Sequence, residues 1–236
     1  MEETSKALQE LFYQYTHLPI GGKEIRCPYW MNLLKKMVYG PYGGKGSPAQ
    51  IVAATEEEAK KEGLDLSQMN TEEIISFMVR KRIGVDCSGL AFALLDALDK
   101  EKGGNGIFDD IPGCQGKTLC RANVCMLTDD NVVTPIERVN DVQVGDMIRL
   151  DGGKHAAVVI SVTRELGAVK EIEYAHSSQK TSLIKGIHSD KIEIVNSDLT
   201  LSNQTWLEKT SDGENYGIKY CLATKGDGIF RLKIWA

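Results

Sequence analysis

The sequence contains no long apolar run, no block of basic residues and no dense set of cysteines. A membrane-spanning helix needs about 20 consecutive apolar residues, so none is expected. Lys and Arg number 28 against 33 Asp and Glu, which gives a formal net charge of −5. Without a basic block, neither nucleic acid nor an anionic membrane is expected as a partner. Six cysteines in 236 residues do not make a disulfide-rich scaffold.

The N-terminus also lacks a recognisable export signal. Residues 1–6 are acidic and have no apolar core of the signal-peptide kind. We therefore expect a protein that stays in the cytoplasm, or a secreted one whose signal has been removed. A length of 236 residues suits one domain with an elaboration, or two small ones, and says nothing about oligomeric state.

Two familiar ligand-binding patterns are incomplete. Cys114, Cys120 and Cys125 cluster without the paired close spacing of a structural zinc site, so buried thiols or one disulfide are expected there. Gly116-Lys117-Thr118 resembles the end of a phosphate-binding loop, but position 111 is Ile where that loop needs glycine. The sequence therefore predicts neither a metal nor an organic cofactor.

Helical patterns dominate the first half of the chain. Apolar residues recur at helical spacing in residues 5–16, and a second short helix is expected to begin at Cys27. Residues 49–82 are helical and charged, with capped helix starts expected at Thr55 and Asn70. We interpret this stretch as a helical insertion or subdomain.

Strand patterns dominate the second half. The predicted strands are residues 147–150, 156–162, 171–175, 191–194, 216–222 and 229–235. Because helices come first and strands later, the order favours an α+β fold with an antiparallel sheet.

The most informative stretch runs from Val85 to Ala97. After Val85 come the acidic Asp86, the thiol of Cys87 and two small residues, Ser88 and Gly89. Apolar residues at helical spacing follow. Asp86 is a good N-cap residue, which places Cys87 in the first turn of a buried helix. There the thiol faces unpaired N–H groups and the positive end of the helix dipole, which favour the reactive thiolate. A small buried cysteine without a chemical role is the alternative.

Asp86 introduces a conflict, because its negative charge opposes thiolate formation at Cys87. We expect its carboxylate to cap the helix and to point away from the sulfur. The backbone amide of Cys87, at the helix start, is the natural donor to an oxyanion.

Two of the four histidines lie at predicted strand ends. His155 precedes the apolar strand and His176 ends the next one. If these strands are adjacent and antiparallel, both histidines lie at one edge of the sheet. Cys87 as nucleophile, His155 as base and His176 as the residue that orients His155 would form a triad. His17 and His188 have no partner in the sequence and are expected to be solvent-facing or structural.

The order of these residues resembles the NlpC-type papain-like cysteine peptidases, which cleave peptide stems of bacterial cell walls. The resemblance rests on Asp86-Cys87-Ser88-Gly89, on Gly145-Asp146-Met147-Ile148 before a strand, and on His155 and His176. It covers about half of the chain. It implies a papain-like fold in which N-terminal helices pack on an antiparallel sheet.

The resemblance further implies a single catalytic domain over residues 1–236, with the helical insertion at about 49–82 ahead of the catalytic helix. The implied activity is that of a cysteine endopeptidase or amidase acting on γ-D-glutamyl linkages, with a peptide or peptidoglycan fragment as substrate. Tyr42, Ser88 and Asp86 become candidates for substrate binding. The alternatives are acyl transfer by the same triad, and a non-catalytic peptide- or glycan-binding module.

Overall fold

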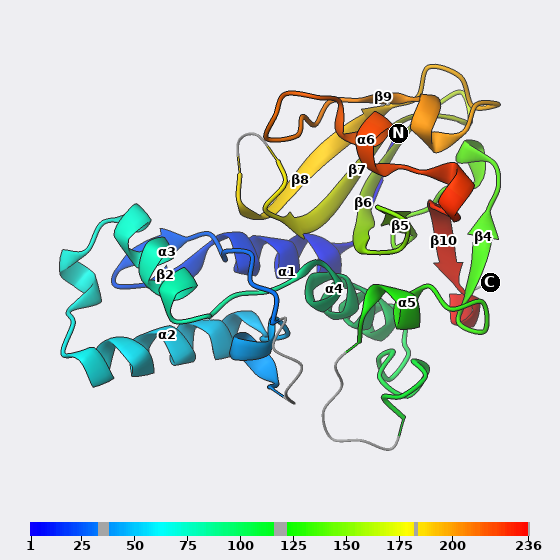
Figure 1. The fold of residues 1–236 in the computed structure, drawn as a ribbon. Coiled ribbons are helices and arrows are strands. Elements are labelled where there is room, and N and C mark those ends of the chain that lie inside the picture. The colour runs from blue at the N-terminus through cyan, green and yellow to red at the C-terminus, as the bar shows by residue number, and fades with distance from the viewer. Residues whose placement is uncertain (33–37, 116–121, 182–183, 236) are drawn as a thin grey trace.

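The computed structural model describes the chain except for residues 33–37, 116–121, 182–183 and 236. An antiparallel sheet lies against a layer of helices, and this confirms the expected α+β class with an antiparallel sheet (Figure 1). No helix among the described residues has the length and apolar character needed to cross a membrane.

Within the described part of the chain the main sheet has eight strands, and every pair of neighbours in it is antiparallel. Its order is β4-β10-β5-β6-β7-β8-β9, and β1 pairs with the far half of β6, where β5 has ended. The strands are β1 Glu2–Thr4, β4 Val133–Ile136, β5 Met147–Leu150, β6 His155–Glu165, β7 Ala168–Ser178, β8 Gly186–Glu193, β9 Thr205–Trp206 and β10 Gly228–Leu232. A separate hairpin joins β2 Leu18–Ile20 to β3 Lys23–Ile25.

Side-chain caps set the starts of the helices. Ser5, Ser47, Asn70 and Asp86 each accept a hydrogen bond from a backbone amide of the first turn that follows, which satisfies a donor that the helix leaves free. The helices are α1 Lys6–Thr16, α2 Pro48–Glu62, α3 Thr71–Arg80, α4 Cys87–Glu101, α5 Val124–Leu127 and α6 Tyr216–Tyr220. The helices predicted over residues 5–16 and after Asn70 and Asp86 are therefore confirmed.

Three predicted elements are wrong. The helix assigned to Thr55 begins earlier, at Pro48, because Ser47 and Gln50 form a capping box. No helix begins at Cys27: residues 27–32 form neither helix nor strand apart from Tyr29, which forms an isolated parallel bridge with Val85. The predicted strand 216–222 is replaced by α6, because the side chain of Asn215 caps the amide of Ile218.

The sheet separates two apolar cores. On one face β6 contributes Ala156, Val158 and Ile160 to a core shared with α1 and α4. On the other face Ala157 and Val159 pack into a second core, which is covered by the segment from η4 (Leu201–Asn203) to α6. Both faces of β6 are buried, as its near-continuous apolar sequence predicts. Figure 1 shows α4 on one side of the sheet and the orange and red C-terminal segment on the other.

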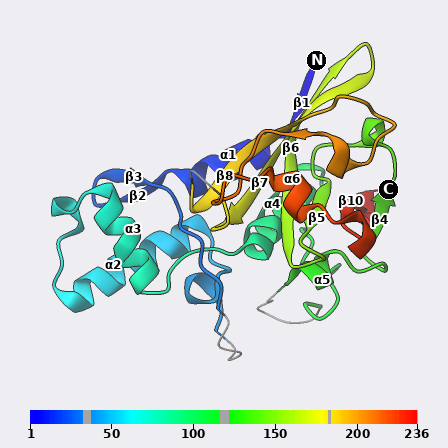
Figure 2. The same cartoon turned by 45° about the horizontal axis from the view of Figure 1, so that its top comes forward.

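Helices α2 and α3 lie at the end of the molecule away from β4 and β10 (Figures 1 and 2). In contacts, α2 packs on β2 and on η1 (Gly40–Gly43), while α3 packs on β3. The charged helical stretch of residues 49–82 is therefore built around the small hairpin.

The start of α4 is packed tightly against a loop. A Cβ atom on Gly89 would lie 2.2 Å from the carbonyl oxygen of Gly44, which itself accepts a hydrogen bond from the amide of Asp86 (3.0 Å). Neither backbone can move away without breaking that bond. We expect Gly89→Ala to lower the free energy of unfolding by about 1–3 kcal/mol.

The measurement for this prediction is urea unfolding followed by circular dichroism, with Gly228→Ala as the matched control. A Cβ atom on Gly228 meets nothing within 4 Å, so that variant should stay within about 0.5 kcal/mol of wild type. Equal stabilities of the two variants would contradict the packing described for α4.

Candidate active site

Cys87 is the first residue of α4 and is 5% exposed. The Asp86 carboxylate before it is held by three donors through Oδ1: the amide of Gly89 at 2.7 Å, Nζ of Lys45 at 2.6 Å and the hydroxyl of Ser88 at 3.1 Å. Lys45 also donates to Ser88 Oγ at 2.6 Å. Asp86 and Ser88, which were candidates for substrate binding, are thus both engaged in building the helix start.

The sulfur of Cys87 lies against the main chain of β6 on both sides of His155. Sγ is 4.0 Å from the carbonyl oxygen of Lys154, and the backbone N–H of Ala156 favours the ionised sulfur. None of the hydrogen bonds among the described residues joins this sulfur to the His155 ring. By strand alternation, Ala156 faces α4, whereas the His155 ring is directed to the other face of the sheet.

The pKa of Cys87 opposes the expectation from helix position. Burial, followed by the charge of Asp86, raises the pKa of the Cys87 thiol to about 11, while the Ala156 amide and Lys45 lower it only in part. The helix start therefore does not suffice to ionise the thiol. With this raised pKa, Cys87 is a neutral thiol at physiological pH.

We expect slow alkylation of Cys87 as a result. A pKa of about 11 against the ordinary 9.0 leaves about 100-fold less thiolate at neutral pH, and the rate should keep rising with pH up to about 11. Iodoacetamide labelling followed by mass spectrometry measures this rate, with the exposed thiol of Cys125 as internal reference.

Asp86→Asn is the matched variant for this measurement, because it keeps a capping oxygen and removes the charge that raises the Cys87 pKa. Labelling of Cys87 should accelerate in this variant, and labelling of Cys125 should not. Fast labelling of wild-type Cys87 at pH 7 would contradict the assigned pKa.

The two predicted strand-end histidines lie together. Strands β6 and β7 are adjacent and antiparallel, as expected, and Nε2 of His155 lies 2.8 Å from Nδ1 of His176. Their rings meet edge to face, with centroids 5.0 Å apart. The Tyr216 ring packs beside both, at 6.4 Å from His155 and 5.5 Å from His176.

A further layer of polar groups lies behind His176. Its Nε2 atom is 2.8 Å from Nε2 of His188 and 3.1 Å from Oε1 of Glu208, and the His188–Glu208 distance is 2.9 Å. His188 is 3% exposed, so of the two positions expected for it, solvent-facing or structural, it occupies a buried, structural one. It lies directly opposite His176 in the β7–β8 register.

Burial dominates the titration of this group. It lowers the pKa of His155 well below the ordinary value, helped by the neighbouring His176, and it also lowers the pKa of His176. For Glu208, burial raises the pKa, but attraction to His176 and hydrogen bonds from His176, His188 and Tyr174 outweigh it and hold the pKa well below its usual range. Glu208 is thus the ionised member of a buried cluster.

The aromatic residue Tyr29 lies near the site and escaped the sequence prediction. Tyr29 is close enough to Cys87 and Asp86 for their charges, after burial, to raise its pKa. Its bridge with Val85 explains this position, and no sequence spacing links the two segments. Tyr42, the tyrosine that was predicted to bind substrate, donates to Glu58 Oε1 of α2 at 3.4 Å; no hydrogen bond or ring contact among the described residues joins it to Cys87 or the histidines.

The predicted cysteine cluster is described in part. Cys114 is disulfide-bonded, one of the two states expected there, and Cys125 is a free, exposed thiol. Cys120 and the segment 116–118 lie outside the described residues.

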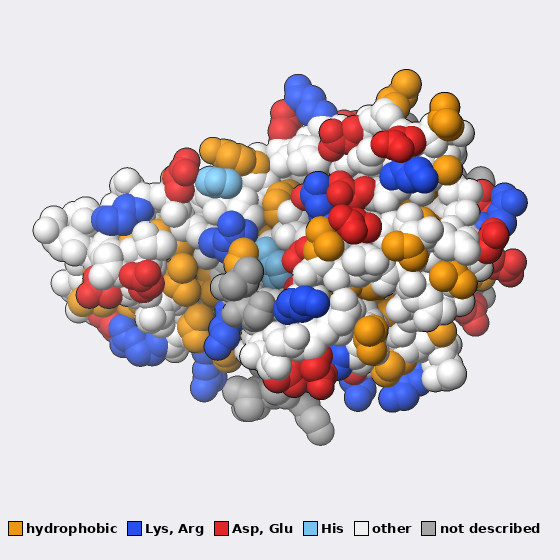
Figure 3. All heavy atoms as spheres, turned by 90° about the horizontal axis from the view of Figure 1, so that it is seen from above, with side chains coloured by type: hydrophobic (Ala, Val, Ile, Leu, Met, Phe, Trp, Pro, Cys, Tyr) orange, Lys and Arg blue, Asp and Glu red, His pale blue; other side chains and the backbone are white. Residues whose placement is uncertain are grey.

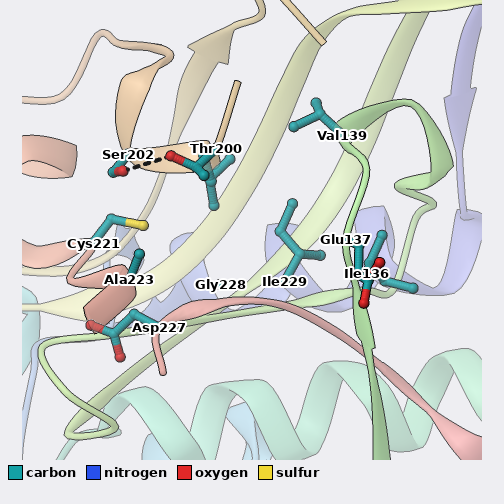
Figure 4. Close-up of a pocket in the computed structure, with 11 residues that line it drawn as sticks. Ile136, Glu137, Val139, Thr200, Ser202, Cys221, Ala223, Asp227, Gly228 and Ile229 are labelled. Atoms are coloured by element: carbon teal, nitrogen blue, oxygen red, sulfur yellow. Dashed lines mark hydrogen bonds between the residues drawn. The ribbon is translucent and has the colours of Figure 1, made fainter. Parts of the chain in front are cut away.

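Two of the cavities found among the described residues border the two apolar cores, and both lie away from Cys87 and His155. The smaller, of about 160 Å³, opens in the second core between β4, η4 and β10, and is lined by side chains that include Glu137, Cys221 and Asp227 (Figure 4). The larger, of about 390 Å³, is mostly apolar and lies between α1, the start of α2 and the face of α4 that carries Gly89 and Phe92. Neither is lined by Cys87, His155 or His176.

Neither sign of charge dominates the face of the molecule drawn in Figure 3. On the face seen in Figure 3, acidic and basic side chains are interspersed, and a histidine side chain is visible near the middle. This distribution agrees with the absence of a basic block in the sequence.

Comparison with known proteins finds no matching family model, no matching curated protein and no matching solved structure. Function must therefore be inferred from the residues and the geometry of this chain.

Proposed function

We propose that the protein is a cysteine hydrolase of peptide amide bonds, with Cys87 as nucleophile, His155 as base and His176 as the residue that orients His155. One observation carries the proposal. The Cys87 sulfur lies against the backbone of residues 154 and 156, and Nε2 of His155, the residue between them, is within hydrogen-bond distance of Nδ1 of His176 (2.8 Å). The nucleophile thus lies at the backbone of the residue that carries the base, at the strand end where the base contacts the orienting histidine.

The hydrogen bond between His155 and His176 can run in the direction that leaves His155 free to act as a base. If Nε2–H of His155 donates to Nδ1 of His176, the lone pair of the His155 ring lies on Nδ1. None of the hydrogen bonds among the described residues uses that atom. His176 then carries its proton on Nε2, where Glu208 accepts it at 3.1 Å. Glu208 is in this way a positioning residue for His176.

The proposed reaction has two steps. The Cys87 thiol gives its proton to Nδ1 of His155 as Sγ bonds to the carbonyl carbon, and that proton passes to the nitrogen of the leaving amine when the C–N bond breaks. Water then gives a proton to Nδ1 of His155 as its oxygen bonds to the thioester carbon. The C–S bond breaks, and the proton on Nδ1 passes to Sγ and restores the thiol. Sγ and Nδ1 must approach each other when substrate binds, which is common for catalytic contacts in ligand-free proteins.

The start of α4 supplies an oxyanion donor. The amide of Cys87 is the first of the helix and has no intrahelical acceptor, so it is available to a developing negative charge. Because the helix begins at Cys87, this donor and the nucleophile come from one residue. For the substrate we propose, from the family resemblance, γ-D-glutamyl linkages of cell-wall stem peptides within a papain-like fold.

The test is hydrolysis of a synthetic stem peptide with an L-Ala–γ-D-Glu bond, followed by mass spectrometry, with a simple amine added in parallel. Wild type should release both fragments, Cys125→Ala should behave like wild type, and Cys87→Ala should be inactive. Retained cleavage in Cys87→Ala, or no cleavage by wild type, would overturn the proposal. Transfer of the acyl group to the amine in preference to water would instead identify an acyltransferase.

A further inference from the structure

We propose that His176, His188 and Glu208 bind one zinc ion, and that the bound ion removes the base function of His155. The three groups come from β7, from β8 and from the segment after β9, and all are buried. The metal site stands on its own geometry. The effect on His155 rests on the proposed function.

Three ligand atoms converge at this point. Nε2 of His176, Nε2 of His188 and Oε1 of Glu208 form a triangle with sides of 2.8, 2.9 and 3.1 Å. A circle through them has a radius of about 1.7 Å, shorter than zinc–ligand bonds of about 2.0–2.1 Å. An ion above their plane can therefore lie at bonding distance from all three, and widening the triangle by a few tenths of an ångström would allow tetrahedral angles.

The outward-facing atoms of the same groups are already held. Nδ1 of His188 donates to the carbonyl oxygen of Gly186 at 3.0 Å, and Oε2 of Glu208 accepts from the hydroxyl of Tyr174. Nδ1 of His176 is bonded to His155. Such outer partners are what orients imidazole and carboxylate ligands toward a metal.

Protons alone do not satisfy this triangle. Because Gly186 offers only an acceptor, Nδ1 of His188 is protonated, and the neutral ring presents the lone pair of Nε2 to the Glu208 carboxylate at 2.9 Å. If His188 also carries a proton on Nε2, that proton faces the Nε2 proton of His176, and the two nitrogens are only 2.8 Å apart. In each case one side of the triangle is repulsive, whereas a cation between the atoms makes all three sides attractive.

The donor set fits a transition metal such as zinc, although two histidines and one carboxylate also suit ferrous iron. Two imidazole nitrogens and one carboxylate oxygen suit zinc and leave its fourth position open. Calcium and magnesium prefer oxygen ligands throughout, so they do not match two histidines.

Zinc at Nε2 of His176 changes the direction of the hydrogen bond to His155. The metal takes the Nε2 lone pair, so the proton of His176 lies on Nδ1 and is donated to Nε2 of His155. The His155 proton then lies on Nδ1, the atom that must accept the proton of the Cys87 thiol. The base is blocked while the ion is bound.

Binding is tested on the whole, untagged chain by isothermal titration with zinc chloride after treatment with a chelator. We expect one zinc per chain, with affinity reduced on the order of 100-fold or more in His188→Ala and about 10–100-fold in Tyr174→Phe, which removes only the hydroxyl that holds Glu208. His17→Gln and Cys87→Ala are the controls and should bind as wild type does.

Absence of stoichiometric binding, or wild-type affinity in both His188→Ala and Tyr174→Phe, would overturn the site. His188→Ala opens a cavity, whereas Tyr174→Phe keeps the ring, so the second variant remains informative if the first does not fold. For the coupling, stem-peptide hydrolysis by wild type should fall with zinc occupancy and return on chelation. Full activity at saturating zinc would overturn the coupling, and an inactive wild type would overturn the proposed function while the binding result stands.

Discussion

Replacing Asp86 with alanine is expected to lower the free energy of unfolding by about 3–5 kcal/mol. The Asp86 carboxylate caps α4 and forms an ion pair with Lys45 at 2.6 Å, in which the two side chains are 9% and 11% exposed. Alanine removes the cap and leaves a buried ammonium without a counter-charge. Breaking a buried pair from one side costs far more than losing an exposed one.

Asp86→Asn separates the two contributions. Asparagine is as good an N-cap as aspartate and still offers an oxygen to Lys45, so we expect a loss of only about 1–3 kcal/mol. Urea unfolding of the two variants beside wild type is the measurement. If alanine costs less than 1 kcal/mol, or if the two variants are equally stable, the ion pair does not have the role assigned to it.

Replacing His155 with alanine is expected to reduce kcat for stem-peptide hydrolysis on the order of 10⁴–10⁶-fold. The base and the nucleophile act as a unit, so loss of the base also disables the nucleophile. The KM should change little, because the proton transfer belongs to the transition state. The assay is run with chelator, so that zinc does not contribute.

His176 gives the matched test of orientation. His176→Ala should lose on the order of 10⁴-fold in kcat, and His176→Asn should recover much of it, because the asparagine side-chain oxygen can accept the Nε2–H of His155. Recovery by asparagine distinguishes a positioning role from a merely structural one. Equal activity of the alanine and asparagine variants would refute the proposed direction of this hydrogen bond.

Local signals predicted the helix that carries the nucleophile. The cap at Asp86 and the apolar spacing that follows placed Cys87 at the first turn of α4, and the structure has it there. The same kind of signal failed at Thr55, where a glutamate-rich run resembled a helix start although Ser47 and Gln50 already formed one. Capping is a short-range interaction, so it is readable from sequence where only one competent cap is present.

The pairing of His155 with His176 was predictable for a related reason. Two apolar strands joined by a short connection are usually adjacent and antiparallel, and the ends that carry the two histidines then meet. His188 and Glu208 could not be assigned in this way. Their meeting depends on the register of β8 against β7 and on the path of the chain after β9.

The α+β class, the α4 cap and the shared edge of the two histidines were thus determined by the sequence alone, because each depends on residues close together in the chain or on neighbouring strands. Tertiary structure decided that Cys87 is a neutral thiol, that Tyr29 lies beside it and that His188 and Glu208 converge on His176. Burial and distant charges control these properties, and both exist only once the two cores have formed on the faces of the sheet.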